Sequence, residues 1–249
     1  MTLVVGLIAK DGIIIASDSQ ATFETGGQST RGSSRKVTVA RDVFAFGMSS
    51  MGSSTKQLIE DALTSRNDWH TKATASALRD QLGQDVNAVL KAQTERSWNA
   101  MRQPGPVIGL IAGMYANGEP HLYEISANGH VAEQTEHGFT AIGSGDIFTY
   151  HAMSTFSSFK LDELPLDHAK VLVYRIIADA VRVAAFGIGG DVQMACIVPA
   201  GKIGKAAALT PEELAKVDYQ VDVWRRLERE ALDEVGLQEL APAPPAEGG

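Results

Sequence analysis

Three residues in the first part of the chain have side chains that together could perform nucleophilic catalysis: Thr2, Asp18 and Lys36. If Met1 is removed, Thr2 carries a hydroxyl nucleophile and, in its α-amine, a base with a pKa of about 7.7–8.0. Such an amine can accept the hydroxyl proton near neutral pH. A nearby lysine ammonium favours the neutral amine, and a carboxylate holds that ammonium in place. By type alone the set is not specific, because Asp–Lys pairs are usually solvated surface pairs.

The first element that must position these residues is a predicted β-hairpin. The runs VVGLIA and IIIAS flank the tripeptide KDG, and an Asp-Gly pair between β-branched runs is a strong hairpin signal. In a hairpin that turns there, Asp18 returns beside Leu3–Val5, close to the chain start. A carboxylate in that position needs a cation, and the next cation on a predicted strand is Lys36 in SSRKVTV.

The remaining segments alternate in blocks of strands and helices. Further strands are predicted at KVTVA, VFAFGM, PVIGLIAGMY, HLYEIS, HVAEQ, FTAIGSGD, DVQMACIVPA and KIGKAAA. Helices are predicted from near Ser53, from about Thr71 to Trp98, from near Ser144, and from about Asp167 to Ala185. The stretch TFETGGQSTRG is interpreted as a loop. Segregated antiparallel strands and helices favour an α+β layered sandwich over a doubly wound parallel sheet.

The C-terminal piece differs from the rest of the chain in charge. From Pro211 to the end there are ten acidic and four basic residues, which account for six of the eight net negative charges. A capping box with proline at the first helical position begins at Thr210, and apolar residues then recur at helical spacing from Leu214 to Trp224. That stripe could pack on the body or on a neighbouring chain. We therefore expect a main domain at 1–209, a helical extension at 210–237 and a disordered tail at 238–249.

Composition excludes several classes of function. A net charge of −8 argues against nucleic acid or an anionic membrane as the main partner. The opening residues lack a signal-peptide pattern, and no run approaches the ~20 apolar residues of a membrane span, so a cytoplasmic protein is expected. The single cysteine, Cys196, rules out an intrachain disulfide and is interpreted as a buried, inert thiol. The six histidines show no metal-ligand spacing, and no metal or cofactor is expected.

The sequence also carries a family resemblance. TLVVGLIAKDGIIIASDSQ resembles the opening of the proteasome β-subunit and HslV-type family of N-terminal-nucleophile hydrolases, whose mature chains begin at a threonine. Those chains have a glycine four residues after the threonine (Gly6 here) and an acid sixteen residues after it (Asp18). SSRKV is similar to the family's active-site lysine segment, and TAIGSGD resembles its Gly-Ser-Gly element. FAFGM falls where the family has a glycine-containing strand lining the substrate cleft. The resemblance covers about residues 2–205.

The resemblance implies a fold and a set of roles. The fold would be a four-layer αββα sandwich, with Thr2 as nucleophile and base and with Lys36 and Asp18 supporting it. The Gly47 N–H would be the oxyanion donor, and Ser144 would handle or orient a proton near the threonine. Structural alternatives stay open: Gly47 as relief of crowding in a strand, and Ser144 as the cap of the following helix.

Substrate recognition and subfamily depend on other positions. Ala45 and Ser49, which flank Gly47, are the candidates for a first specificity pocket. Eukaryotic and archaeal-type β subunits usually carry Asp and Ser, three apart, before a Gly pair. Aligned on its own Gly pair, this chain has Ala185 and Ile188 there. It is therefore more similar to a bacterial homologue of the HslV kind. The acidic C-terminal helix has no counterpart in HslV.

The expected function is that of a threonine-type endopeptidase cleaving unfolded polypeptide inside a homo-oligomeric, double ring, after ordinary removal of Met1. An ATP-dependent unfoldase is a candidate partner. Two other classes stay open. A retained Met1 would block the amine and give a non-catalytic ring or scaffold subunit. A non-proteolytic N-terminal-nucleophile amidohydrolase or peptide ligase would keep the chemistry and use it on other substrates.

Overall fold

The structure, a computed structural model, describes residues 2–25, 28–50, 53–99, 107–156, 160–183 and 187–237. It opens with the predicted hairpin, in which β1 (Val4–Ala9) pairs antiparallel with β2 (Gly12–Asp18). The register runs from Val4↔Ser17 to Ala9↔Gly12, and the Asp18 N–H donates to the Leu3 carbonyl at 3.3 Å. The hairpin therefore returns Asp18 to the chain start, as predicted. The position of its turn was predicted wrongly: because Ala9 pairs with Gly12, the turn residues are Lys10 and Asp11, and Gly12 begins β2 without a positive φ.

The strands form two halves of one sheet. The first half has the order β10 (Phe139–Ile142), β1, β2, β11 (Val192–Ala200) and β12 (Ile203–Ala208). The second has the order β5 (Val37–Ala40), β6 (Phe44–Ser50), β7 (Val107–Ala116), β8 (Glu119–Ser126) and β9 (Val131–Glu133). In the described residues, β12 meets β7 through the pair Ile203↔Ala116. A link this short lets the two halves stack face to face.

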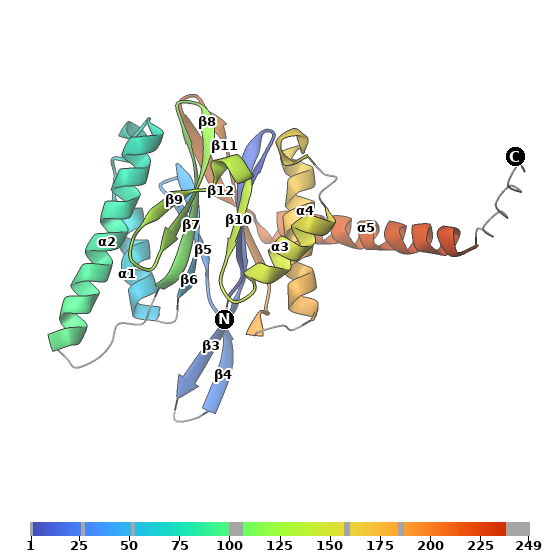
Figure 1. The fold of residues 1–249 in the computed structure, drawn as a ribbon, viewed down its shortest axis with the longest axis horizontal. Coiled ribbons are helices and arrows are strands. Elements are labelled where there is room, and N and C mark those ends of the chain that lie inside the picture. The colour runs from blue at the N-terminus through green and yellow to red at the C-terminus, as the bar shows by residue number, and fades with distance from the viewer. Residues whose placement is uncertain are drawn as a thin grey trace, which may run out of the picture.

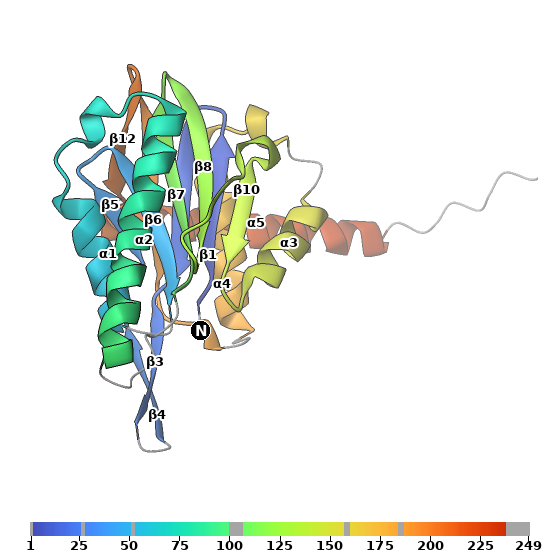
Figure 2. The ribbon, with the colours of Figure 1, turned by 60° about the vertical axis from the view of Figure 1, so that its left-hand side comes forward.

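Three apolar layers show that the halves are stacked and covered by helices. The inner layer joins residues of both halves, including Val4, Ile15, Ile111 and Leu122. A second layer lies between the first half and the helices α3 (Asp146–Thr155) and α4 (Leu166–Arg182), and a third between the second half and the helices α1 (Ser53–Ser65) and α2 (Ala75–Asn99). Figures 1 and 2 show the two helix pairs on opposite sides of the strands. The predicted four-layer αββα sandwich is confirmed.

The predicted helices are present, with shifted ends. The second helix begins at Ala75 because Trp69–Thr71 forms a separate 3-10 turn, η1. Thr74 precedes the helix, and its hydroxyl accepts the Ala77 N–H at 3.3 Å, as a capping side chain does. Two further 3-10 turns, η2 (Thr135–His137) and η3 (Leu161–Glu163), stand before β10 and α4.

The stretch TFETGGQSTRG, interpreted above as a loop, belongs to a second hairpin, and that interpretation was wrong. The strands β3 (Gln20–Thr25) and β4 (Gln28–Ser33) pair antiparallel from Gln20↔Ser33 to Thr25↔Gln28. In the described residues they pair only with each other, and the hairpin projects from the body beside the chain start (Figure 1). Its residues are mostly polar, and apolar alternation is confined to Ala21 and Phe23, so the strand signal is weak, although Gly-Gly is a recognised hairpin turn.

The last helix, α5 (Pro211–Leu237), begins at the predicted capping box. The Thr210 N–H donates to Glu213 Oε2 at 2.7 Å, and the Glu213 N–H donates to Thr210 Oγ1 at 3.2 Å. The first half of α5 packs on the body, where Val217 and Val221 are buried. Beyond that contact the helix projects away from the sandwich (Figure 1).

An arginine on α4 fastens α5 to the body. Arg175 donates to both carboxylate oxygens of Glu228, each at 2.6 Å, and its guanidinium lies 4.2 Å from the Trp224 ring centre. Bidentate pairing and stacking suit the planar arginine group. No helix in the described part of the chain has the length and apolar character needed to cross a membrane.

Candidate active site

Thr2 lies two residues before the start of β1, which stands between β10 and β2 in the first half-sheet, and is 5% exposed. Its N–H donates to Ser144 Oγ at 3.4 Å, and its carbonyl accepts the Gly145 N–H at 3.3 Å. Gly143 has φ +100, and a Cβ added there would overlap the Thr2 carbonyl oxygen. The Gly-Ser-Gly element therefore forms the support of Thr2, and glycine at 143 is required by both conformation and space. Ser144 lies at the site, as predicted.

Asp18 ends β2 and is fully buried. Its Oδ1 accepts the Leu3 N–H at 2.9 Å and the Lys36 ammonium at 2.8 Å. Its Oδ2 accepts the N–H groups of Gln20 and Gly189, each at 3.2 Å. Four donors saturate this carboxylate, so a buried charge is fully compensated.

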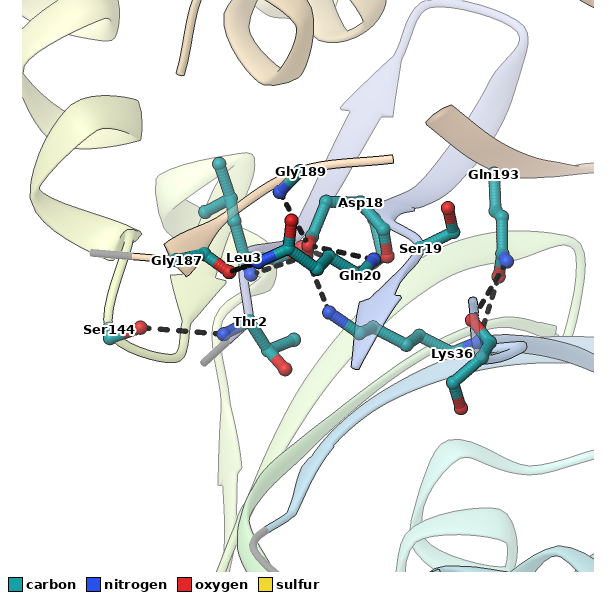
Figure 3. A network of polar contacts seen from close by, with 12 residues as sticks. Thr2, Leu3, Asp18, Ser19, Gln20, Lys36, Ser144, Gly187, Gly189 and Gln193 are labelled. Atoms are coloured by element: carbon teal, nitrogen blue, oxygen red, sulfur yellow. Dashed lines mark hydrogen bonds and ion pairs between the residues drawn. The ribbon is translucent and has the colours of Figure 1, made fainter. Parts of the chain in front are cut away.

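Lys36 completes the set predicted from the sequence. Its side chain is 6% exposed and points at Asp18 (Figure 3). Burial lowers the pKa of the Lys36 ammonium, and the charge and hydrogen bond of Asp18 oppose that shift. Because the N–H of Leu3, the residue next to Thr2, binds the same Asp18 oxygen as the ammonium, the pair lies at the N-terminus. The structure therefore brings Thr2, Asp18, Lys36 and Ser144 together.

The three candidates on β6 share the face that points at the first half-sheet. Ala45 is fully buried in the inner apolar layer. A Cβ on Gly47 would overlap a methyl group of Val4, which supports the crowding interpretation. Of the three, Ser49 reaches the support of Thr2, since its Oγ lies 3.4 Å from where a Gly143 Cβ would stand.

The amide of Gly47 has a direction that bears on its predicted role. The Met48 N–H donates to the Lys36 carbonyl, which makes Val37↔Gly47 a non-hydrogen-bonded pair. The Gly47 N–H therefore points at its other neighbour, Ile111 on β7. This argues against Gly47 as oxyanion donor. The register shift between Ser49 and Ser50 is the point on β6 at which the regular ladder is interrupted.

Several residues that contact the set were not found from the sequence. Gly189 supplies a donor to Asp18, and Gln20 joins that loop by donating its Nε2 to the Gly187 carbonyl at 2.7 Å. The only local signal was the run of glycines in FGIGGD. Ala185 lies outside the described residues, whereas Ile188 is buried in the layer beneath α4. Gln193 contacts the segment that carries Lys36 (Figure 3).

The site brings together the Thr2 hydroxyl, the Thr2 backbone nitrogen and the Asp18–Lys36 ion pair, all of them largely buried. In the described residues no three His, Cys, Asp or Glu side chains form a group that could hold a metal ion. A hydroxyl beside a buried Asp–Lys ion pair is the kind of arrangement used in nucleophilic catalysis.

Comparisons with known proteins place this geometry in a family. The structure of Anbu, described as an ancestral beta-subunit, from Yersinia bercovieri matches with a TM-score of 0.66 at 16% identity, covering 97% of this chain and 99% of that chain. A Gly-1 mutant of Anbu from Hyphomicrobium sp. strain MC1 matches with a TM-score of 0.66 at 15% identity, covering 97% of this chain and 100% of that chain. At these identities the likeness shows the fold alone.

No curated protein sequence gives a significant match. The family model of the proteasome subunit matches residues 2–197, which is most of the chain and starts at Thr2. The chain belongs to the proteasome subunit family.

Proposed function

We propose that the protein is a threonine-type endopeptidase whose catalytic unit is residues 1–209, with Thr2 as its N-terminal nucleophile after Met1 is removed. The observation that supports this most is the shared acceptor: one oxygen of buried Asp18 receives both the N–H of Leu3 and the ammonium of Lys36. That arrangement holds a cation beside the future N-terminus at the cost of desolvating both charges. A surface ion pair would give no such placement.

The proposed reaction follows the types of these groups. The Thr2 hydroxyl oxygen attacks a peptide carbonyl carbon while its proton passes to the Thr2 α-amine. The tetrahedral intermediate collapses, the amine proton goes to the leaving nitrogen, and an acyl ester forms on Thr2. Water, deprotonated by the same amine, then attacks the ester carbonyl. The bond from Thr2 Oγ to the acyl carbon breaks, the proton on the amine returns to Thr2 Oγ, and the acyl group leaves as a carboxylic acid. Lys36 lowers the pKa of the α-amine by like-charge repulsion, and Ser144 orients that nitrogen.

An oxyanion donor must come from a backbone amide near Thr2. We assign this role to the bulge at Ser49 and Ser50 in place of Gly47, because the Gly47 N–H is directed at β7 and Ser49 adjoins Gly143. A donor placed for the developing charge contributes more than one aimed at the ground state. Ser49 remains a candidate for the specificity pocket, whereas the position of Ala45 inside the inner layer favours a packing role.

Assembly is the second part of the proposal. Proteasome-family subunits form oligomeric rings, and we propose that copies of this chain form a homo-oligomeric ring, in double form, in the cytoplasm, with unfolded polypeptide as substrate and an ATP-dependent unfoldase as candidate partner. The stripe of α5 that carries Val217 and Val221 continues to Leu232 and Val235, which are 70% and 69% exposed. A projecting helix draws little stability from itself, so this part of the 210–237 extension is proposed to pack on a second copy.

The test compares substrates of two sizes on the assembled particle. The proposal predicts hydrolysis of unfolded casein and of short fluorogenic peptides, with loss of both in Thr2→Ala and retention in Thr2→Ser. Cleavage of the peptides with no cleavage of casein would favour the small-amide enzyme. Cleavage of neither, with Met1 retained, would favour the ring or scaffold subunit.

A further inference from the structure

We infer that Gln193 is a positioning residue for Lys36: its side chain takes the place of a missing strand and fixes the backbone from which the lysine reaches Asp18. This inference rests on the proposed function, in which the Lys36 ammonium tunes the α-amine of Thr2. Gln193 touches no reacting atom, and its effect passes through Lys36.

The segment that carries Lys36 has an unusual need for such support. Residues 34–36 lie between the end of β4 at Ser33 and the start of β5 at Val37, and they belong to no strand. Backbone groups outside a ladder must find other partners when they are buried. Lys36 itself is 5% exposed, so water is a poor substitute there.

One side-chain amide supplies three of the partners. Gln193 Oε1 accepts the Lys36 N–H at 2.7 Å and the Val37 N–H at 3.3 Å, and Gln193 Nε2 donates to the Ser34 carbonyl at 3.0 Å. Figure 3 shows the Gln193 side chain extended towards the backbone of Lys36. The pattern uses an acceptor and a donor at the same time, which only a glutamine or asparagine amide combines in this way. Asparagine is one methylene shorter and would not span the same gap.

We call the three hydrogen bonds of the Gln193 amide to residues 34, 36 and 37 the Gln193 clamp. The backbone of Gln193 connects this clamp to Asp18, the partner of Lys36 in the ion pair. On β11, Gln193 pairs with Ser17, and its neighbour Val192 pairs with Asp18. A single residue therefore links the strand that presents Asp18 to the segment that presents Lys36. The 2.8 Å distance between Lys36 Nζ and Asp18 Oδ1 is therefore supported from both sides by β11, while β6 holds the Lys36 carbonyl through the Met48 N–H.

This placement has a catalytic consequence. A lysine side chain has four rotatable bonds, so the position of its ammonium follows the position of its backbone only if the backbone is fixed. A displacement of about 1 Å in a catalytic group can cost about 100-fold in rate. If the ammonium moves away from the Thr2 amine, the amine keeps its proton to higher pH, so a smaller fraction of it is free to accept the hydroxyl proton at neutral pH.

The experiment uses the full chain and the variant Gln193→Met, which keeps the volume and removes all three hydrogen bonds. Gln193→Asn is a second variant that keeps an amide in case the methionine variant fails to fold. The matched control is Gln134→Met, since Gln134 is also half-buried but lies beside β8, with its Nε2 on Glu124. Two quantities are measured: the rate of Thr2 acylation by a peptidyl β-lactone as a function of pH, and amide hydrogen exchange at residues 36 and 37.

The expected result is a loss of about 10- to 100-fold in acylation rate at neutral pH for the Gln193 variants, with the acidic limb of the pH profile moved to higher pH and faster exchange at residues 36 and 37. The control should match the wild type in all three respects. A Gln193 variant with the wild-type rate and profile overturns the inference. A wild type that is never acylated contradicts the proposed function, and the exchange data alone then decide whether the clamp exists.

Discussion

Replacing Asp18 with asparagine should destabilise the folded protein by about 3–5 kcal/mol at neutral pH. Asparagine has the shape of aspartate but offers one acceptor oxygen and one NH2 group. Whichever way it is oriented, two of the four present donors lose their acceptor: either the Lys36 ammonium and the Leu3 N–H, or the N–H groups of Gln20 and Gly189. Each buried group left unsatisfied costs about 1–3 kcal/mol, and the ammonium also loses its counter-charge.

The pH dependence of this loss has a definite sign. Burial already lowers the folded-state pKa of Lys36, and removing Asp18 removes the main contribution that raises it. With a lower folded-state pKa, the unfolded chain binds more protons above that pKa, so the stability of the variant rises with pH up to the ordinary lysine value of about 10.4. The deficit of the variant is therefore largest at neutral pH and shrinks as the pH increases.

The assay is urea unfolding followed by tryptophan fluorescence at pH 7 and pH 9.5, at a fixed protein concentration because assembly contributes to stability. The control is Glu163→Gln, which neutralises a carboxylate paired with Lys160 at 2.9 Å but 66% exposed, and should change stability by less than about 0.5 kcal/mol. A deficit for Asp18→Asn below about 1 kcal/mol, or one that grows with pH, would refute the reasoning.

Three other predictions follow from single features of the structure. Gly143→Ala should abolish Thr2 acylation, because the new methyl group must displace the Thr2 carbonyl. The control is Gly201→Ala, where φ is +73 and a new Cβ would have no atom within 4 Å. It should cost only about 1–2 kcal/mol of strain and leave acylation intact. Burial raises the pKa of the Cys196 thiol to about 12, so the thiol should resist iodoacetamide at pH 8 in the native protein. In urea it should gain a single alkyl group, measured by mass spectrometry. Alkylation of the native protein would contradict the burial of Cys196. Leu232→Glu should lower the particle mass in light scattering, whereas Glu230→Gln should leave the mass unchanged. Equal masses for the wild type and Leu232→Glu would remove the proposed role of the α5 stripe.

Local chemistry in the sequence was enough to predict the frame of the site. The KDG tripeptide between two β-branched runs predicts the β1–β2 hairpin, and the observed register, centred on Lys10 and Asp11, places Asp18 next to Leu3. The spacing of apolar residues predicts most of the remaining strands and helices, and most of their predicted ends lie within a few residues of the observed ones. Because a buried carboxylate needs a cation, the sequence also predicts Lys36 as the partner of Asp18. The distance between Lys36 Nζ and Asp18 Oδ1 could be known only from the structure.

Contacts between distant segments could not be predicted in this way. Gly189 and Gln193 meet Asp18 and Lys36 across 171 and 157 residues of sequence, and these contacts exist only because β11 pairs with β2. The β3–β4 hairpin was missed for a different reason: Ala21 and Phe23 are the only apolar residues of its described strands, which is too short an alternation to indicate a strand pair. The direction of the Gly47 amide depends on which pairs of the β5–β6 ladder are hydrogen-bonded, a property that no residue type encodes.

The central claim is that Thr2 becomes an N-terminal nucleophile, and the intact mass of the purified protein tests it most directly. The mass is measured before and after incubation with a peptidyl β-lactone, with Thr2→Ala treated in parallel. Opening of the lactone ring adds the whole reagent to the hydroxyl oxygen, so one adduct gives one defined mass increment. The account predicts a chain that lacks Met1, gains one adduct and gains none in Thr2→Ala. A chain that retains Met1 and gains no adduct would contradict it and leave a ring subunit without this chemistry.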